Sequence, residues 1–160
     1  MNWLMQSKKK NIIKLLIRSN MEVKIINKSK HRLPEYETPG SAGMDLKADI
    51  DEPMKLKAHS SIIIPTGLYV AIPDGYEMTI RSRSGLAFKY DIVAFHGLVD
   101  SDYRNEVKVK LFNLSNDDFL IHPGERIAQI KIAPYEKVKW NEVSELDETE
   151  RKGGFGSTGI

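Results

Sequence analysis

Charged and apolar residues alternate without interruption in the stretch Glu106-Val107-Lys108-Val109-Lys110-Leu111. Successive side chains of a strand point to opposite faces of its sheet, so this alternation predicts a strand with one buried face and one face in solvent. Since β-branched side chains fit a pleated, half-buried surface, we expect further strands wherever short stretches are rich in them. Such stretches occur before and after Glu106–Leu111 in the sequence, at Val23–Ile26, Ile62–Ile64, Leu68–Ile72 and Ile127–Ile132.

Clusters of turn-forming residues separate the apolar stretches. They are Pro39-Gly40, Pro73-Asp74-Gly75, Asn113 to Asp118, and Pro123-Gly124. Each cluster predicts a chain reversal, because proline presets one backbone dihedral and glycine tolerates a positive φ. After Met21 no segment keeps helical periodicity for three turns, although Ser84–Tyr90 could form a short helix. Many short strands at this spacing predict an all-β sandwich, jelly roll or barrel.

The overall composition suits one domain. A length of 160 residues and a hydrophobic content of 41% are enough for a core. The chain has no cysteine, which excludes disulfides, a thiol nucleophile and a zinc–thiolate site, and which suits a reducing compartment such as the cytoplasm. No apolar run reaches the roughly 18 residues that a membrane-spanning helix needs, so we expect no membrane partner.

The first 20 residues differ from the rest in charge. They hold five of the 24 basic residues and no acidic residue, which leaves 19 basic against 22 acidic residues, a net charge of −3, for residues 21–160. Since that part has no basic face, we do not expect nucleic acid as its ligand. Apolar residues interleave with lysines in residues 1–20. This pattern fits a targeting presequence, a membrane-surface helix or translated sequence upstream of a start at Met21.

Five polar stretches interrupt the strand pattern, and the first two supply a carboxylate and several donors. Pro39 to Leu46 is a small-residue turn that leads into Asp45, a residue that could equally serve as a turn or cap residue. Arg81 to Ala87 offers a guanidinium fork, serine hydroxyls and an exposed amide at Gly85, which are the donors that a polyphosphate needs. The alternative for this stretch is a serine that caps a helix, with solvated arginines around it.

The third and fourth stretches add a second carboxylate and an amide. Gly97 to Arg104 has Asp100 at an expected strand end, three residues before Tyr103. The carboxylate could hold a water and the ring could support a sugar, or the aspartate could bond the backbone of a hairpin turn. Pro123 to Gln129 is a turn followed by a strand with one polar residue among apolar ones. Gln129 could also be a satisfied core amide.

The fifth stretch is the glycine-rich end Arg151 to Gly159, which alone is typical of a disordered terminus. In this order and spacing, the five stretches resemble the five motifs of the trimeric dUTPase family. The matching segments are Ser41–Asp45, Arg83–Ala87, Asp100–Tyr103, Gly124–Gln129 and Gly153–Gly159. The resemblance implies an all-β, distorted jelly-roll (β-clip-like) subunit and a homotrimer with active sites at its subunit interfaces.

The resemblance also implies a function, dUTP diphosphatase. Such an enzyme hydrolyses dUTP to dUMP and pyrophosphate by Mg²⁺-assisted attack of water at the α-phosphorus. The reaction keeps uracil out of DNA and supplies dUMP for thymidylate synthesis. The implied organisation of the chain has three parts: 1–20 as an extension outside the domain, 21–146 as the dUTPase β domain and 147–160 as a flexible C-terminal lid segment.

Roles for single residues follow from the same resemblance. Asp100 corresponds to the general base that activates the attacking water, and Gln129 to a residue beside that water. Asp45 corresponds to the carboxylate that holds a metal-bound water, since Mg²⁺ keeps waters and the triphosphate supplies its direct ligands. The residues implied to bind the substrate are Arg83, Ser84, Gly85, Gly97, Leu98, Val99, Tyr103, Lys108, Arg151, Phe155, Gly156, Ser157 and Thr158.

The choice of base needs no special side chain. Uracil has a donor at N3 and an acceptor at O4, whereas cytosine reverses that pair, so backbone groups around Gly97–Val99 can tell them apart. Strand walls would exclude the methyl group of thymine, and Tyr103 beneath the sugar would resist a 2′-hydroxyl. In the lid segment, Arg151 would meet phosphate charge and Phe155 would stack on uracil.

The chain departs from the family pattern at three places. Ser82 stands where a proline is common, and Asn105 stands where a glycine is usual. Because asparagine tolerates left-handed dihedrals, we expect the turn at Asn105 to survive. The gap from Arg151 to Phe155 is one residue shorter than usual. His96 lies near a position where other members have asparagine, and we assign it no role.

Two other functions remain open at this point. A dCTP deaminase shares the fold resemblance, but it would lack the Tyr103 platform and the glycine-rich end, and it would need a glutamate base beside the pyrimidine. A catalytically idle nucleotide-binding or protein-interaction trimer is a different class of protein. The presence of both Asp100 and Arg151 argues against the idle trimer.

Overall fold

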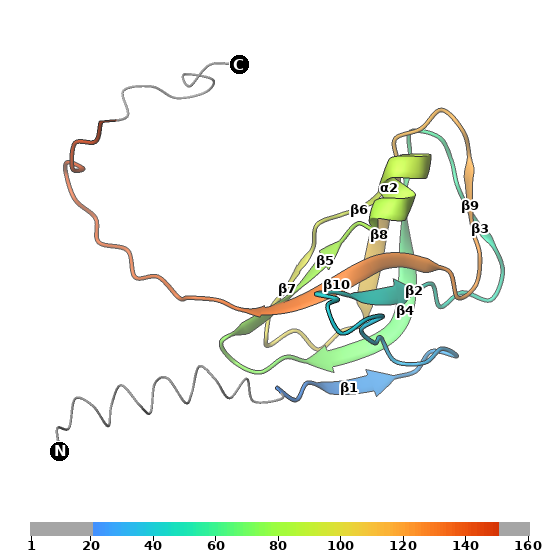
Figure 1. Cartoon of the computed structure of the whole chain (residues 1–160), viewed down its shortest axis with the longest axis horizontal. Helices are drawn as coiled ribbons and strands as arrows, with labels where there is room; N and C mark the ends of the chain where they lie inside the picture. The colour runs from blue at the N-terminus through green and yellow to red at the C-terminus, as the bar shows by residue number, and fades with distance from the viewer. Residues whose placement is uncertain (1–20, 151–160) are drawn as a thin grey trace.

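In the computed structural model, which describes residues 21–150, the chain is almost entirely β-structure (Figure 1). The all-β prediction is confirmed, and the short helix predicted at Ser84–Tyr90 is present as α2. Among the described residues, no helix is long and apolar enough to cross a membrane. The strands are β1 (Lys24–Asn27), β2 (Met44–Lys47), β3 (Met54–Leu56), β4 (Ser61–Ala71), β5 (Tyr76–Arg81), β6 (Ile92–Ala94), β7 (Leu98–Val99), β8 (Val107–Asn113), β9 (Phe119–Ile121) and β10 (Arg126–Pro134).

Two four-stranded antiparallel sheets and a two-stranded ribbon make up the fold. The strand order is β1-β4-β8-β6 in one sheet and β2-β10-β5-β7 in the other, while β3 pairs with β9 in the ribbon. Most neighbouring strands are distant in the sequence, as in the predicted distorted jelly roll. The second sheet therefore brings together strand ends from four separate parts of the chain.

Strand β8 has the alternation that its sequence predicts. Val107, Val109 and Leu111 are at most 2% exposed, whereas Lys108 and Lys110 on the opposite face are exposed. The strand lies between β4 and β6, and its apolar face belongs to one continuous core. Burial of each such side chain contributes about 1.5–3 kcal/mol to the free energy of unfolding, so this alternation determines which face of the sheet turns inward.

The apolar stretches Ile62–Ile64 and Leu68–Ile72 fall in the same strand, β4. Only Ile72 lies beyond the end of this strand. The strand continues through Pro65, and its pairing with β8 shifts register between Pro65 and Leu68. Such a bulge accommodates a proline, which has no N–H for the ladder. Gly67 in the bulge has a φ of 67°, and a Cβ there would lie 2.7 Å from the backbone nitrogen of Ser29, so the position requires glycine.

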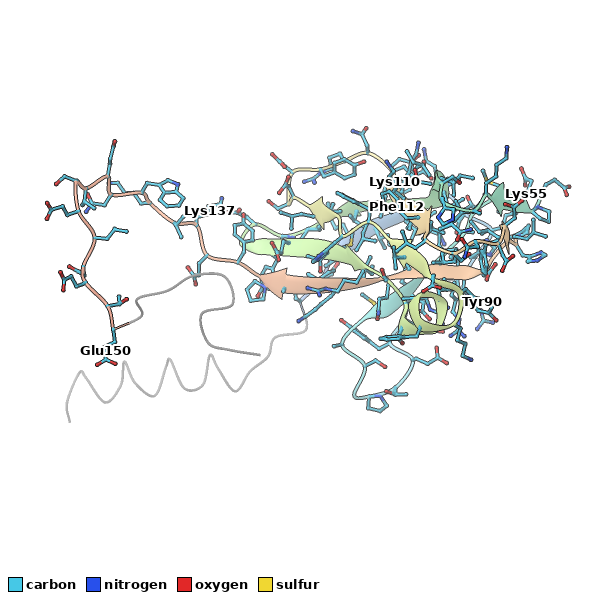
Figure 2. The ribbon with its side chains drawn as sticks, turned by 90° about the horizontal axis from the view of Figure 1, so that it is seen from above. Lys55, Tyr90, Lys110, Phe112, Lys137 and Glu150 are labelled. Atoms are coloured by element: carbon cyan, nitrogen blue, oxygen red, sulfur yellow. The ribbon has the colours of Figure 1, made fainter. Side chains whose placement is uncertain are left out.

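After β10 the chain extends away from the sheets as far as Glu150 (Figure 2). Residues 135–150 form neither helix nor strand. Several of their large apolar side chains are exposed, among them Trp140 at 90% and Leu146 at 88%. We refer to residues 135–150 as the arm.

Candidate active site

Strands β2, β10 and β5, on one side of sheet β2-β10-β5-β7, bring three of the five polar stretches together. Gln129 on β10 pairs with Asp45 on β2 and, on its other side, with Arg81 on β5. Asp45 therefore lies within a strand, and its alternative assignment as a turn or cap residue is wrong. Because Arg81 is the last residue of β5, the loop that carries Ser82 and Arg83 begins directly beside Gln129.

Two guanidinium groups hold the carboxylate of Asp45. Arg83 Nε donates to Oδ1 at 3.1 Å, and Arg126 Nη1 donates to Oδ2 at 3.3 Å. Arg83 Nη1 also donates to the backbone oxygen of Arg126 at 2.9 Å. The side chains of Arg83 and Asp45 are 24% and 27% exposed, so solvent still reaches the cluster. Glu37 lies 4.0 Å from Arg126, and its carboxylate balances the second positive charge.

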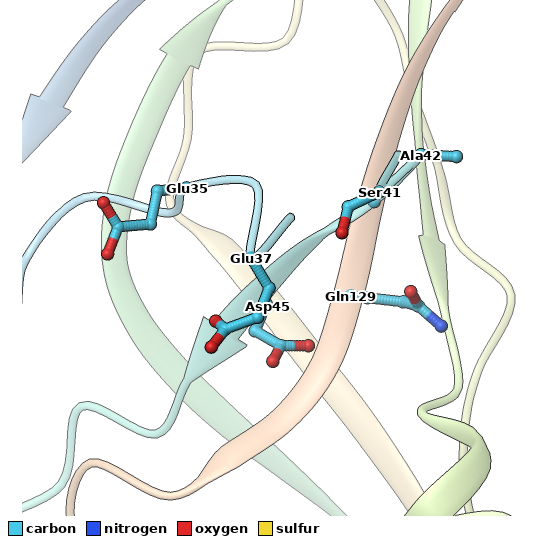
Figure 3. A pocket seen from close by; sticks show the side chains of 7 residues that line it. Glu35, Glu37, Ser41, Ala42, Asp45 and Gln129 are labelled. Atoms are coloured by element: carbon cyan, nitrogen blue, oxygen red, sulfur yellow. The ribbon is translucent and has the colours of Figure 1, made fainter. Parts of the chain in front are cut away.

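An open cleft of about 240 Å³ lies over this cluster (Figure 3). In the figure the carboxylates of Glu37 and Asp45 lie close together, and the amide of Gln129 lies farther along the cleft. Carboxylate, hydroxyl and amide oxygens are ligands or second-sphere partners that suit Mg²⁺. The lining residues are Glu35, Glu37, Ser41, Ala42, Gly43, Asp45 and Gln129.

The side chains of residues 21–150 do not by themselves form a metal-binding site. No group of three or more histidine, aspartate or glutamate side chains there converges closely enough to hold a metal ion. The carboxylate, hydroxyl and amide donors at the cleft fit a hydrated ion that takes its remaining ligands from water or from phosphate oxygens.

The amide of Gln129 is fixed by the loop that precedes α2. Its Nε2 donates to the backbone oxygen of Ser82 at 2.8 Å. A Cβ on Gly43 would lie 2.8 Å from the Oε1 of Gln129 and 3.3 Å from the backbone oxygen of Ile130, so the first stretch approaches β10 as closely as glycine allows. The amide nitrogen of Gln129 therefore has a hydrogen-bond partner within the protein, as the alternative assignment to a core amide expected. The residue nevertheless also lines the cleft.

The loop into α2 is tied down at Ser82. The Ser82 hydroxyl accepts from the Ala94 N–H at 2.9 Å and lies 3.3 Å from the Ala94 oxygen, which anchors the loop to β6. Arg83 is the N-cap of α2 and makes no side-chain cap bond, so the alternative of a helix-capping serine is wrong. Ser84 and Gly85 form the exposed start of the helix, next to the clamped guanidinium of Arg83.

The third polar stretch lies at the opposite edge of the same sheet. Asp100 directly follows β7, at a strand end as predicted. Strand β7 pairs only with β5 in this sheet, and β5 and β10 separate it from β2. Since neighbouring strands are about 4.8 Å apart, roughly 14 Å separate β7 from β2. One chain thus assembles Asp45, Arg83 and Gln129, but it does not bring Asp100 to them.

Tyr103 and Lys108 are both linked to Glu106. The Tyr103 hydroxyl donates to the Glu106 backbone oxygen at 2.9 Å, and Lys108 Nζ lies 3.5 Å from the Glu106 carboxylate. The same carboxylate accepts the N–H of Gly67 at 2.9 Å, which ties this loop to the bulge of β4. Within the described part of the chain, only His59 and Asp91 are non-glycine residues with positive φ, so the loop does not need a left-handed residue at Asn105.

Both backbone polar groups of Gly97 form hydrogen bonds within the chain. Its oxygen accepts from Ile80 N–H at 2.8 Å, and its N–H donates to Phe95 at 2.9 Å. Because backbone groups alternate in direction along a strand, those of Leu98 face away from β5. Strand β7 is an edge strand, so this outward side has no partner strand within the sheet.

Other predicted site residues lie outside the described residues, namely Arg151, Phe155, Gly156, Ser157 and Thr158. Sequence reasoning gave no role to Arg126 or Glu37, although both belong to the cluster around Asp45. Arg126 carries a weak sequence signal, since it is a charged residue between a Pro-Gly turn and an apolar strand. Glu37 carries none that distinguishes it from an ordinary surface residue.

The chain is similar to known proteins in family, sequence and structure. A family model described as dUTPase matches residues 29–159. Deoxyuridine 5′-triphosphate nucleotidohydrolases of Finegoldia magna and Fusobacterium nucleatum are 50% and 51% identical to this chain over 142 residues. Each alignment covers 87% of this chain, and 99% and 97% of the two relatives.

Solved structures of dUTPases have the same fold. A mutant dUTPase of Staphylococcus bacteriophage 80alpha, with dUpNHpp, has a TM-score of 0.78 at 25% identity and covers 87% of this chain and 99% of its own. A mutant dUTPase from phage phi11 of S. aureus, described with a coordinated structural Mg(II) ion, has a TM-score of 0.71 at 22% identity. That alignment covers 79% of this chain and 99% of the phage protein.

The close approach at Gly43 generates a prediction about stability. We expect Gly43→Ala to lower the free energy of unfolding by about 1–3 kcal/mol, because the added methyl group must displace Gln129 or the backbone of β10. Gly40→Ala is the matched control, since a Cβ there meets no atom within 4 Å. Urea unfolding at one protein concentration measures both. Equal stability of the two variants would contradict the packing argument.

Proposed function

The chain belongs to the dUTPase family, and from this membership we propose that it hydrolyses dUTP to dUMP and pyrophosphate. The observation that carries the proposal is that residues of three separate motifs lie together beside one cleft. Asp45 and Gln129 line the cleft from adjacent strands, and Arg83, in the loop between β5 and α2, binds Asp45. The relatives at about 50% identity, which are named for this substrate, support the same activity. The reaction would keep uracil out of DNA, supply dUMP for thymidylate synthesis, and take place in the cytoplasm.

Hydrolysis would proceed by attack of water on the α-phosphorus. Asp100 would accept the proton of the water as the new P–O bond forms, and the bond to the β-phosphate oxygen would break with pyrophosphate as leaving group. Gln129 would help to orient the water. Arg83, Ser84 and the Gly85 amide would offset the charge that develops on the phosphate oxygens.

Magnesium fits the donors around the cleft. When bound, it would supply charge neutralisation for the triphosphate, which would provide its direct ligands. Asp45 would hold a water of the ion, a role that suits a carboxylate still about a quarter exposed. The Mg(II) ion described for the phage phi11 dUTPase supports an affinity of such proteins for this metal.

Base selection would occur at the outer edge of β7. Leu98 turns one N–H and one C=O away from β5, a donor and an acceptor that complement O4 and N3 of uracil. Gly97 and Val99 would shape this hairpin around the base. Tyr103, 37% exposed and held through its hydroxyl, would lie against deoxyribose, and Lys108 would extend the contact surface.

A complete site would form between copies of the chain, in a homotrimer. One chain separates Asp100 and Tyr103 from Asp45 by the width of the sheet, so a second copy would supply the missing groups. The cleft of about 240 Å³ is also smaller than the roughly 300–1,000 Å³ of ordinary small-molecule sites. The apolar side chains exposed along the arm support association, because a neighbouring copy would remove them from water.

The C-terminal segment would close over the bound nucleotide. Residues 1–20 would be an extension, residues 21–146 the β domain and residues 147–160 the lid segment. In the lid, Arg151 would meet phosphate charge and Phe155 would stack on uracil. Gly156, Ser157 and Thr158 would bond the γ-phosphate. Ordering a glycine-rich segment is costly, so closure would depend on the nucleotide.

A pyrophosphate-release assay with dUTP, dCTP, dTTP and UTP tests the function. We expect Mg²⁺-dependent release from dUTP, with the other nucleotides disfavoured by unpaired backbone groups, a methyl clash and the 2′-hydroxyl respectively. Removal of the metal with a chelator should abolish release. Ammonia release from dCTP, or no turnover of dUTP by a folded protein, would refute the proposal.

Substitution of the proposed base tests the mechanism. We expect Asp100→Asn to lower kcat by about 10²–10⁴-fold, which is the usual loss when a general base is removed. Affinity for a non-hydrolysable imido analogue of dUTP should remain. Asp74→Asn, in an exposed turn, is the matched control. Near-normal turnover by Asp100→Asn would remove this residue from the mechanism.

Truncation after Glu150 tests the lid. We expect the shortened protein to keep its fold and its oligomeric state by light scattering but to lose most of its kcat, because closure completes the site and excludes water. Phe155→Ala alone should lower kcat/KM roughly 5- to 150-fold, the range for one stacked base, whereas Phe155→Tyr keeps the ring and serves as control. Unchanged kcat/KM in the truncated enzyme would rule out the lid.

A further inference from the structure

Asp45 is bound by a second guanidinium that the proposed mechanism does not use. Arg126 Nη1 lies 3.3 Å from Oδ2 of Asp45, while Arg83 takes the other carboxylate oxygen. Arg126 is the more exposed of the two arginine side chains, at 47% against 24%. The contact joins residues 81 positions apart in the sequence, so it depends on the pairing of β10 with β2.

A bulge sets the position of Arg126. The pairing of β10 with β2 shifts register between Arg126 and Ala128, and regular pairing continues from Ala128 with Leu46 to Gln129 with Asp45. Bulges redirect side chains and free backbone groups from the ladder, and they occur often beside active sites. Here the Arg126 oxygen accepts from Arg83 Nη1 at 2.9 Å, while its side chain turns to Asp45 and Glu37.

Arg83 has to give up its contact with Asp45 before its Nε can donate to a phosphate oxygen. Its Nε is committed to Asp45 and its Nη1 to the Arg126 oxygen. If Arg83 were the sole partner of Asp45, its transfer to a phosphate oxygen would leave a partly buried carboxylate without a counter-ion, which opposes the transfer. Arg126 binds the other oxygen of Asp45, so the carboxylate stays compensated while Arg83 moves.

We propose that Arg126 is a positioning residue that holds Asp45 and thereby releases Arg83 for the polyphosphate of the substrate. Arg126 acts through Asp45 and does not itself touch the nucleotide. The proposal rests on dUTP hydrolysis as the function. Arg126 would thus affect substrate binding only through the side chain of Asp45.

A double-mutant cycle separates this role from direct contact. The variants are Arg126→Gln, Asp45→Asn and the double substitution, with Lys131→Gln as the control, an exposed lysine on the same strand that loses the same charge. Isothermal calorimetry with the imido analogue of dUTP and Mg²⁺ measures affinity, and steady-state assays give kcat and KM. Activity of the unsubstituted enzyme in the same assay tests the proposed function independently.

We expect Arg126→Gln to weaken binding of the analogue roughly 5- to 10-fold, as for one half-exposed charge-assisted contact, and to raise KM more than it lowers kcat. In the Asp45→Asn background the same substitution should change affinity by less than about twofold, because the carboxylate it serves is gone. Arg126→Lys should restore much of the affinity, and Lys131→Gln should leave it unchanged.

The opposite pattern overturns the proposal. Equal losses from Arg126→Gln with and without the Asp45 carboxylate would mean that Arg126 contacts the substrate itself. An unchanged affinity in Arg126→Gln would mean that Arg126 neither holds Asp45 nor releases Arg83 for the substrate. If Arg126→Gln does not fold, the cycle is run with Arg126→Met, which also removes the charge and whose loss of affinity should likewise vanish in the Asp45→Asn background.

Discussion

The antiparallel pairing of β10 with β2 on one side and β5 on the other is the constraint on which the site depends. It sets Gln129 beside both Asp45 and Arg81, and it starts the loop that carries Arg83 within reach of the Asp45 carboxylate. A shift of one residue would turn each side chain of β10 to the other face, exposing core residues such as Ile130. The register that buries the core is therefore the register that assembles the cleft.

The ion pairs at the cleft contribute little to folding stability, and their members can exchange partners. Asp45 is shared between Arg83 and Arg126, and Glu37 lies near the second guanidinium. Partly exposed ion pairs contribute only about 0–1 kcal/mol to folding, so the core, and not this cluster, holds the sheet together. A cluster of this kind can change partners at small cost. That property suits a site proposed to take a magnesium triphosphate, whose own charges replace those of the protein.

The division of motifs between two edges of one sheet explains why association and activity are linked in the proposed function. Strand β2 carries Asp45 at one edge, and β7 leads into Asp100 at the other. Rigid, paired strands cannot fold back to join these edges within a chain. A neighbouring copy could bring one edge to the other, and the exposed Trp140 of the arm provides apolar surface for such contact.

Local patterns in the sequence determined the elements of this protein. The alternation around Val109 and the helix at Ser84–Tyr90 follow from side-chain periodicity within a few residues, and the order of the five polar stretches identified the family. The tertiary structure decided what these patterns could not. Passage of β4 through Pro65 depends on a bulge against β8, and the pairing of Arg126 with Asp45 depends on a bulge between strands far apart in sequence. Periodicity reports which face of a strand is buried, whereas register and bulges arise from the packing of strands that meet only when the chain folds.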